Sequence, residues 1–193
     1  LTALKGEAHA TRLRRGIDKD LYHPKRRDRG WLKQTFGIDE DRFVLLFVGR
    51  ADESKKVMTA ARAARRLLDL GRPIHFFLAG DGADRDAVRS LLGPNATLPG
   101  FLEPDILAAV YASADVLVFP SQSEIMPNVV MEAKASALPP IVDAGDASAQ
   151  LVARPGLDGL LVQDETPAAW ATTIDQLIQT PSCHLAMRQA ART

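Results

Sequence analysis

The chain has 193 residues, of which 46% are hydrophobic and 25% are charged, the balance of an ordinary soluble globular protein. Its formal net charge is zero, so no overall electrostatic field draws it to nucleic acid or to a membrane. The single cysteine, Cys183, cannot form an internal disulfide, and no apolar run approaches the length of a membrane span. We therefore expect a cytoplasmic protein, with peripheral contact at the inner membrane face as an alternative.

Residues 1–30 are polar and basic, with clusters of cations at residues 12–15 and 25–29. Aromatic residues do not alternate with these cations, so we expect no nucleic-acid binding, whereas contact with an acidic membrane surface stays open. We interpret residues 1–30 as a largely solvated linker or edge segment from a preceding domain. Because the chain begins without methionine, we expect it to be a fragment of a longer protein.

Apolar runs of strand length follow, alternating with stretches that favour helix. A run that is apolar throughout is typical of a strand buried on both faces of a parallel sheet. The predicted strands are residues 42–48, 73–79, 96–98, 115–119, 140–142 and 158–162. The predicted helices are residues 31–36, 57–70, 84–92, 105–113, 127–137, 167–179 and 184–192.

This alternation predicts an α/β fold, a Rossmann-like parallel sheet with helices on both faces and right-handed crossovers. We place the domain at residues 31–180 and expect residues 181–193 to form a helix that packs toward the preceding domain. His75 lies inside an apolar run, so we expect a packed core residue rather than a catalytic base.

Ligands of such sheets bind beyond the C-terminal ends of the strands. Several polar or glycine-rich turns fall at that edge: Gly49-Arg50, Gly80-Asp81-Gly82, Gly100-Phe101 and residues 121–128. The turn Gly80-Asp81-Gly82 carries no weight alone because it is common. Neither a dinucleotide fingerprint nor a P-loop is present, and no His/Cys cluster has metal-ligand spacing, so we expect no metal.

Residues 121–139 contain two glutamates, Glu124 and Glu132, on either side of a predicted helix start. Pro127 suits the first helical position, where its missing N–H costs nothing. The free N–H groups that follow would then form an anion site, and they belong to Asn128, Val129 and Val130. On spacing alone, a solvated helix face explains two such glutamates better than a binding site does.

The order of the motifs along the chain makes a binding site the better explanation for the two glutamates. Along the chain they are Val48-Gly49-Arg50, Lys55, Gly80-Asp81-Gly82, Gly100-Phe101, Ala114-Asp115, Pro120-Ser121 and Glu124-x7-Glu132. Over residues 12–192 this set resembles the C-terminal domain of GT-B glycosyltransferases of the retaining group 1, or GT4, family. The resemblance implies a domain that binds a nucleotide-diphosphate sugar. It also implies that the full-length enzyme transfers the sugar, of hexosyl type, with retention of configuration.

The resemblance also implies roles for the polar residues of these motifs. Arg50 and Lys55 would hold the donor diphosphate and stabilise the charge of the leaving nucleotide in place of a metal. Because Lys56 is next to Lys55, either lysine could be the one that holds the diphosphate. Glu132 would accept hydrogen bonds from the ribose hydroxyls, and Glu124 would contact the donor sugar and stabilise positive charge near its anomeric carbon.

The remaining predicted contacts are with the backbone and the base. Gly49 would belong to the donor-binding site, and the amides of Asn128, Val129 and Val130 would cap the phosphate. Phe101 and Leu102 would border the base. Two departures from the family pattern stand out, since Pro127 and Ala137 occupy positions where glycine is usual.

Two other classes of function remain open. One is a catalytically silent nucleotide-sugar-binding module, which Pro127 and Ala137 favour. The other is a different GT-B enzyme, such as a sugar-nucleotide epimerase, which the Glu124-x7-Glu132 spacing argues against. We expect no cofactor besides the donor, and an acceptor that is a saccharide, a lipid or a small molecule. The missing N-terminal domain would be a partner, and the fragment alone would be inactive.

Overall fold

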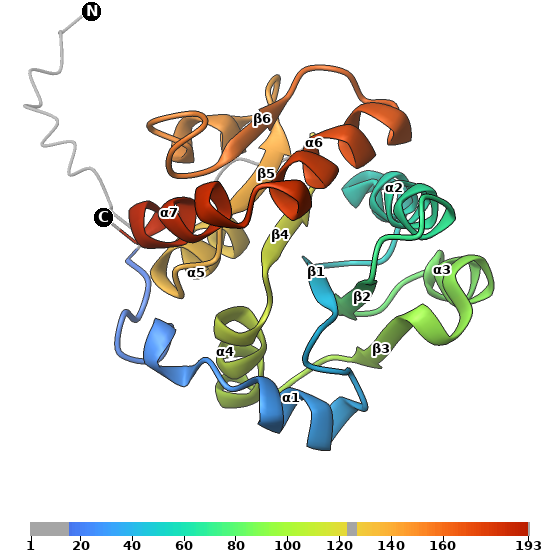
Figure 1. Cartoon of the computed structure of the whole chain (residues 1–193), viewed down its shortest axis with the longest axis horizontal. Coiled ribbons are helices and arrows are strands. Elements are labelled where there is room, and N and C mark those ends of the chain that lie inside the picture. Colours follow the sequence, from blue (N-terminus) through green and yellow to red (C-terminus); the bar gives the residue numbers. More distant parts are fainter. Residues whose placement is uncertain (1–15, 123–126, 193) are drawn as a thin grey trace, which may run out of the picture.

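The apolar runs lie side by side in one sheet, the framework of the fold (Figure 1). The structure is a computed structural model that describes residues 16–122 and 127–192. Within these residues all neighbouring strands pair in parallel, in the order β3-β2-β1-β4-β5-β6. The strands are β1 (Phe43–Val48), β2 (Ile74–Ala79), β3 (Ala96–Gly100), β4 (Val116–Phe119), β5 (Pro140–Asp143) and β6 (Leu160–Val162). The predicted Rossmann-like α/β fold is confirmed.

Helices cover both faces of this sheet. The α-helices are α1 (Arg29–Phe36), α2 (Val57–Asp69), α3 (Arg85–Leu92), α4 (Pro104–Ser113), α5 (Asn128–Ala135), α6 (Pro167–Gln179) and α7 (Pro181–Ala191). Short 3-10 helices are η1 (Pro24–Arg26), η2 (Glu53–Lys55), η3 (Gly93–Asn95) and η4 (Ala147–Leu151). Because side chains alternate along a strand, Leu45 and Phe47 face α2, α3 and α6, whereas Val44 and Leu46 face α1, α4 and α5.

Local signals set the ends of several helices. Gly71, with φ of +73°, lies just past the end of α2, in a conformation that glycine adopts without strain. Thr166 accepts a hydrogen bond from the Ala169 amide at the start of α6, and Pro167 occupies the first turn. The bounds of α6 therefore coincide with the predicted ones. The helix predicted over residues 127–137 differs slightly from the observed one. Pro127 is the N-cap, and α5 begins one residue later, at Asn128.

The basic run at residues 25–29 is not the solvated linker that we predicted. Arg27 Nη2 lies 2.9 Å from Asp115 Oδ1, and Arg29 Nη1 lies 3.1 Å from Asp115 Oδ2. Both guanidinium groups also donate to carbonyls at the C-terminus of α4. Cations suit this position because the last carbonyls of a helix lack intrahelical partners and carry the negative end of its dipole. Arg27 and Arg29 are therefore structural.

α7 reaches the same helix end from the other direction. The buried Arg188 donates to the carbonyls of Ala114 (2.7 Å) and Ala112 (3.1 Å), and His184 Nε2 lies 2.7 Å from the Asp115 carbonyl oxygen. Burial lowers the pKa of Arg188 to about 10, which leaves it charged at neutral pH. α7 thus packs on the described domain, and its approach to a preceding domain stays a prediction.

The end of α5 contains a residue in a strained conformation. Ala137, where the family pattern has glycine, has φ of +55°. The Leu138 amide donates to the Ala133 carbonyl (2.8 Å) and the Ala137 amide to the Lys134 carbonyl (3.0 Å), the pair of bonds that defines a Schellman motif. In that motif a left-handed residue is required, and any side chain there costs free energy.

We expect Ala137→Gly to raise the free energy of unfolding by roughly 1 kcal/mol, because it removes the left-handed strain at a modest entropic cost. Urea denaturation measures the change. The matched control is Ala135→Gly, two positions earlier and inside α5, which should lower stability by about the same amount. Equal effects of the two substitutions would contradict the prediction.

Candidate functional site

Three loops meet at the C-terminal edge of the sheet, where ligands of such folds bind. They follow β1, β2 and β3, and backbone hydrogen bonds join them to one another. The Ala51 amide donates to the Asp81 carbonyl (2.9 Å), the Asp84 amide to the Ala51 carbonyl (2.8 Å), and the Gly80 amide to the Gly100 carbonyl (2.8 Å). These bonds hold the three loops in fixed positions around one opening.

Glycines make this close approach feasible. A Cβ atom on Gly80 would lie 1.9 Å from the Gly49 carbonyl oxygen, and a Cβ atom on Gly82 would lie 2.5 Å from that of Ala51. Gly49 and Gly80 also share φ of +141°, a region that other residues avoid. The turn Gly80-Asp81-Gly82, which has little meaning in the sequence alone, is therefore a steric requirement of this edge.

The opening leads into a cavity of about 280 Å³. The cavity brings together four of the predicted binding residues from two separate motifs, Gly49, Arg50, Phe101 and Leu102. Apolar side chains and backbone form most of its wall, a surface suited to the flat faces of a base or a sugar ring. Its complete lining is Val48, Gly49, Arg50, Ala79, Gly80, Phe101, Leu102 and Leu107.

Four of these lining residues were not among the predicted binding residues, namely Val48, Ala79, Gly80 and Leu107, although Val48 and Gly80 belong to the motifs. Val48 and Ala79 end β1 and β2, so their place at the C-terminal edge was available from the strand pattern. Leu107 comes from the first turns of α4, which no motif marked. Phe101 lines the cavity with 80% of its surface exposed, so its ring is accessible to a ligand.

Arg50 lies at the rim in a polar cluster of its own loop. Its Nη2 donates to Ser54 Oγ (2.9 Å), and its Nε lies 3.4 Å from Asp52 Oδ2. The Ser54 hydroxyl donates to Asp52 Oδ1 at 2.5 Å. This hydrogen bond is the main cause that holds the pKa of Asp52 below its usual value. Because the guanidinium is largely exposed, an incoming anion can replace the weak Asp52 contact.

The two neighbouring lysines differ in their surroundings. Lys56 Nζ lies 2.6 Å from Glu165 Oε2 and also donates to Gln122. Gln122 in turn donates to Glu165 (2.6 Å) and to the buried Asp143 (2.8 Å). Within the fold the charge of Lys56 is therefore offset by Glu165. Lys55, the half-buried last residue of η2, also interacts within the fold, so the choice between the two lysines as phosphate ligand stays open.

Glu132 is half-buried on α5 and does not line the cavity. Tyr111 Oη donates to its Oε2 at 2.9 Å, and the rings of Tyr111 and Tyr22 meet edge to face with centroids 5.7 Å apart. Burial raises the pKa of Glu132 above its usual value, and the hydrogen bonds of Tyr111 and Tyr22 oppose that shift. The sequence offered no motif that marked either tyrosine.

The predicted anion site at the start of α5 needs one correction. The Val130 amide donates to the Pro127 carbonyl at 3.1 Å, so the prediction of a free Val130 N–H group is wrong. Pro127 closes this bond because it is the N-cap rather than the first helical residue. Asn128 and Val129 occupy the first turn as predicted, whereas Glu124 lies outside the described residues.

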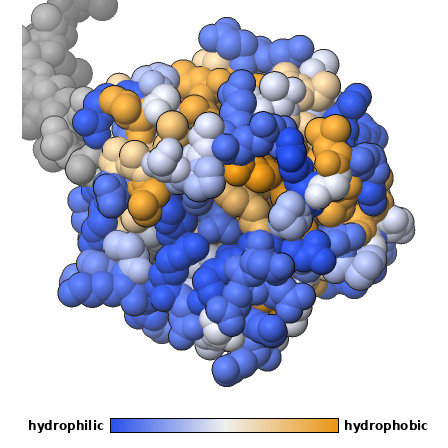
Figure 2. All heavy atoms as spheres, viewed as in Figure 1, coloured by the Kyte–Doolittle hydropathy of each residue, from blue (hydrophilic) through white to orange (hydrophobic). Residues whose placement is uncertain are grey.

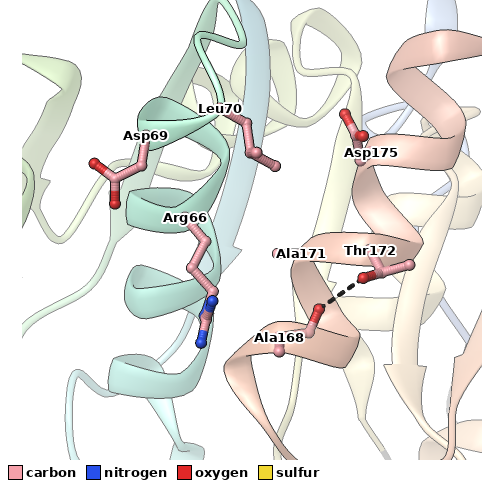
Figure 3. Close-up of a pocket in the computed structure, with 7 residues that line it drawn as sticks. All are labelled: Arg66, Asp69, Leu70, Ala168, Ala171, Thr172 and Asp175. Atoms are coloured by element: carbon pink, nitrogen blue, oxygen red, sulfur yellow. Dashed lines mark hydrogen bonds between the residues drawn. The ribbon is translucent and has the colours of Figure 1, made fainter.

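A second cavity, of about 310 Å³, lies between α2 and α6 (Figure 3). None of the predicted site residues belongs to it. Its lining is Arg66, Asp69, Leu70, Ala168, Ala171, Thr172 and Asp175. Arg72 binds both oxygens of Asp175, at 2.6 and 3.0 Å, and Thr172 donates to the Ala168 carbonyl. Asp175 and Thr172 thus have partners within the fold, and the cavity beside Gly49, which holds the predicted residues, is the stronger candidate.

Two further observations concern ions and membranes. Among the described residues, no group of three or more His, Cys, Asp or Glu side chains is placed to hold a metal ion. In residues 16–122 and 127–192, no helix has the length and apolar character needed to cross a membrane. The face of the molecule in Figure 2 is largely hydrophilic, with hydrophobic side chains exposed in separate patches.

Residues 42–180 match the family model described as glycosyl transferases group 1. The D-inositol 3-phosphate glycosyltransferase 1 of Catenulispora acidiphila is 34% identical over 190 residues, which cover 91% of this chain and 45% of that protein. The chain thus spans less than half the length of this relative.

Two solved structures share the fold. Anabaena HepE in complex with UDP and glucose matches with a TM-score of 0.78 and 20% identity, covering 92% of this chain and 49% of that one. The C-terminal domain of the group 1 family protein LpcC from Francisella tularensis matches with a TM-score of 0.78 and 19% identity. That match covers 92% of this chain and 95% of the other.

Proposed function

Because this chain belongs to the group 1 glycosyl transferase family, we propose that the cavity beside Gly49 binds the nucleotide of a nucleotide-sugar donor. The observation that carries the proposal is the convergence of Gly49 and Arg50 with Phe101 and Leu102 at the C-terminal edge of the sheet. These residues come from different motifs, and only the fold brings them together. An apolar cavity with a cation at its rim suits a base and a diphosphate, respectively.

The chemistry of the site follows from charge. When a nucleotide diphosphate leaves, negative charge grows on its phosphate oxygens, and a fixed cation nearby lowers the barrier. Arg50 and Lys55 supply such cations without a metal ion. Glu132 would hold the ribose, and Glu124 would contact the transferred sugar. Retention of configuration and the identity of the acceptor stay predictions.

Transfer itself would need the part of the protein that the curated relatives have beyond this region. The chain covers 45% of its Catenulispora relative, so the acceptor site would belong to a second domain. Closure of two domains commonly completes a transferase site and excludes water from it. We therefore expect this chain alone to bind the nucleotide and to transfer no sugar.

Titration calorimetry of the 193-residue chain with UDP, GDP and ADP tests the proposal. UDP comes first because the Anabaena neighbour was solved with it. Arg50→Ala and Lys55→Ala should each weaken binding roughly tenfold or more, since each removes a charge-assisted contact with phosphate. Because the family resemblance assigns the phosphate contact to Lys55, Lys56→Ala should have a smaller effect.

The matched control is Leu70→Ala in the cavity between α2 and α6, where the side chain is 63% exposed and remote from the predicted motifs. It should leave the affinity unchanged. Absence of binding by all three nucleotides at millimolar concentration and low salt would overturn the proposed function. Equal losses from Lys55→Ala and Lys56→Ala would overturn the assignment of the phosphate ligand.

One observation keeps a silent binding module as the second candidate. Pro127, at the N-cap of α5, has no N–H group and provides no side-chain cap. A donor phosphate at this helix start would thus find one backbone donor fewer. Nucleotide binding combined with no transfer by the full-length protein, across a panel of acceptors, would support this candidate.

A further inference from the structure

The chain contains two tyrosines, and both lie at Glu132. Tyr111 is fully buried and donates its hydroxyl to Glu132 Oε2 at 2.9 Å. Tyr22, in the segment before η1, is also buried and sets its ring edge to face against Tyr111. Three elements far apart in sequence therefore enclose one carboxylate.

Helix geometry relates this cluster to the cavity beside Gly49. Leu107 forms part of the cavity wall, and Tyr111 follows it by four residues on α4. Residues with this spacing lie on the same helix face, one turn apart. Tyr111 is thus one turn beyond the cavity wall, and Glu132 contacts it there. The carboxylate is therefore tied, through Tyr111, to the helix that supplies part of the cavity wall.

The half-buried position of Glu132 needs an explanation. Burying a carboxylate costs free energy, and an apolar side chain would fill the same place at lower cost. A carboxylate has about four acceptor positions on its two oxygens, of which the hydroxyls of Tyr111 and Tyr22 occupy two. Because two packed aromatic rings cannot turn easily, the hydroxyls fix the direction of the carboxylate. The remaining acceptor positions are then oriented for a ligand that donates hydrogen bonds.

We propose that Tyr111 and Tyr22 are positioning residues, which hold Glu132 so that its remaining acceptor positions face the ribose hydroxyls of the donor. This inference rests on the proposed function and adds to it the two tyrosines that orient the ribose acceptor. It also makes the segment before α1 part of the donor site, because Tyr22 belongs to that segment.

A comparison of ribose and 2′-deoxyribose nucleotides tests the proposal. The 193-residue chain is titrated with whichever of UDP, GDP and ADP binds most tightly and with its 2′-deoxy analogue. The wild-type chain should prefer the ribonucleotide by roughly tenfold, the typical value of a hydrogen bond to a charged group. Tyr111→Phe and Tyr22→Phe should each reduce this preference, and the affinity for the 2′-deoxy analogue should stay within about twofold.

A double-mutant cycle separates positioning from general packing. If Tyr111 acts through Glu132, then Tyr111→Phe should change the preference in the wild-type chain and leave it unchanged in Glu132→Gln. A purely structural role would instead weaken binding of both nucleotides equally in both backgrounds. Near-ultraviolet circular dichroism checks that each variant is folded, and Tyr22→Phe provides an independent measurement if Tyr111→Phe unfolds.

The outcomes distinguish failure of the proposed function from failure of the positioning role. No binding of any nucleotide by the wild-type chain would overturn the proposed function, and the positioning role with it. Binding without a preference for ribose, or with a preference that neither tyrosine substitution changes, would overturn the positioning role alone. The expected result has two parts. Either folded tyrosine variant loses the preference for ribose, and the same substitution has no effect on the preference in the Glu132→Gln background.

Discussion

Gly80→Ala is expected to lower the free energy of unfolding by roughly 3–5 kcal/mol and to abolish nucleotide binding. The new Cβ atom would lie 1.9 Å from the Gly49 carbonyl oxygen, so the loops after β1 and β2 would have to separate. At φ of +141° the alanine backbone is strained as well. Separation would move Gly49 and Arg50, and with them the wall of the cavity.

The matched control is Gly71→Ala. Gly71 also has a positive φ, +73°, but no heavy atom lies within 4 Å of an added Cβ there. Its substitution should cost only the conformational strain of about 1–2 kcal/mol and leave nucleotide affinity intact. Urea denaturation and nucleotide titration measure both effects. Gly80→Ala with the stability and affinity of Gly71→Ala would show that the loops tolerate separation.

His75 is expected to make the stability of the fold depend on pH between about 4 and 6.5. It is buried in β2 with Nε2 at 2.9 Å from Thr97 Oγ1, as the sequence pattern predicted for a core residue. Burial, and then the charge of Arg42, lower the pKa of His75 from 6.5 to about 4. The unfolded chain therefore binds its proton at higher pH than the folded protein does.

The sign of the effect follows from this difference. The neutral His75 stabilises the fold fully above pH 6.5, and this contribution is lost as pH falls toward about 4. At 1.36 kcal/mol per pH unit, the loss amounts to roughly 3 kcal/mol. His75→Gln keeps a polar partner for Thr97 and does not titrate. The difference in unfolding free energy between wild type and His75→Gln should thus fall by roughly that amount from pH 7 to pH 4.

Urea denaturation at intervals of pH measures both proteins. All other titrating groups are common to them and cancel in the difference. Parallel stability curves for wild type and His75→Gln would contradict the lowered pKa. A difference that grows as pH falls would imply the opposite sign, a histidine stabilised in its charged form.

The sheet was predictable because its strands are apolar along their whole length. Burial on both faces leaves a local signal that β1, β2 and β4 carry clearly. The packing of residues 16–30 left no such signal. Arg27 and Arg29 bind Asp115, which lies 88 and 86 positions further along the chain, and a basic run looks the same whether it is solvated or paired.

The site was predictable to the extent that motifs marked it. Gly49, Arg50, Phe101 and Leu102, which line one cavity, were singled out because their motifs resemble those of group 1 glycosyltransferases. Leu107 was not found, since an apolar residue in a helix is ordinarily part of the core. The first turn of α5 was placed one residue too early, because proline fits both the N-cap and the first helical position.

The arginines around the end of α4 define how much chain the fold needs. Arg27 and Arg29 come from before β1, and Arg188 comes from the last helix, yet all three donate to carbonyls within residues 112–114. The region that matches the family model, residues 42–180, contains none of them. A protein trimmed to that region would leave Asp115 buried without its cations. The unit that folds with Asp115 paired is therefore larger than the region that matches the family model.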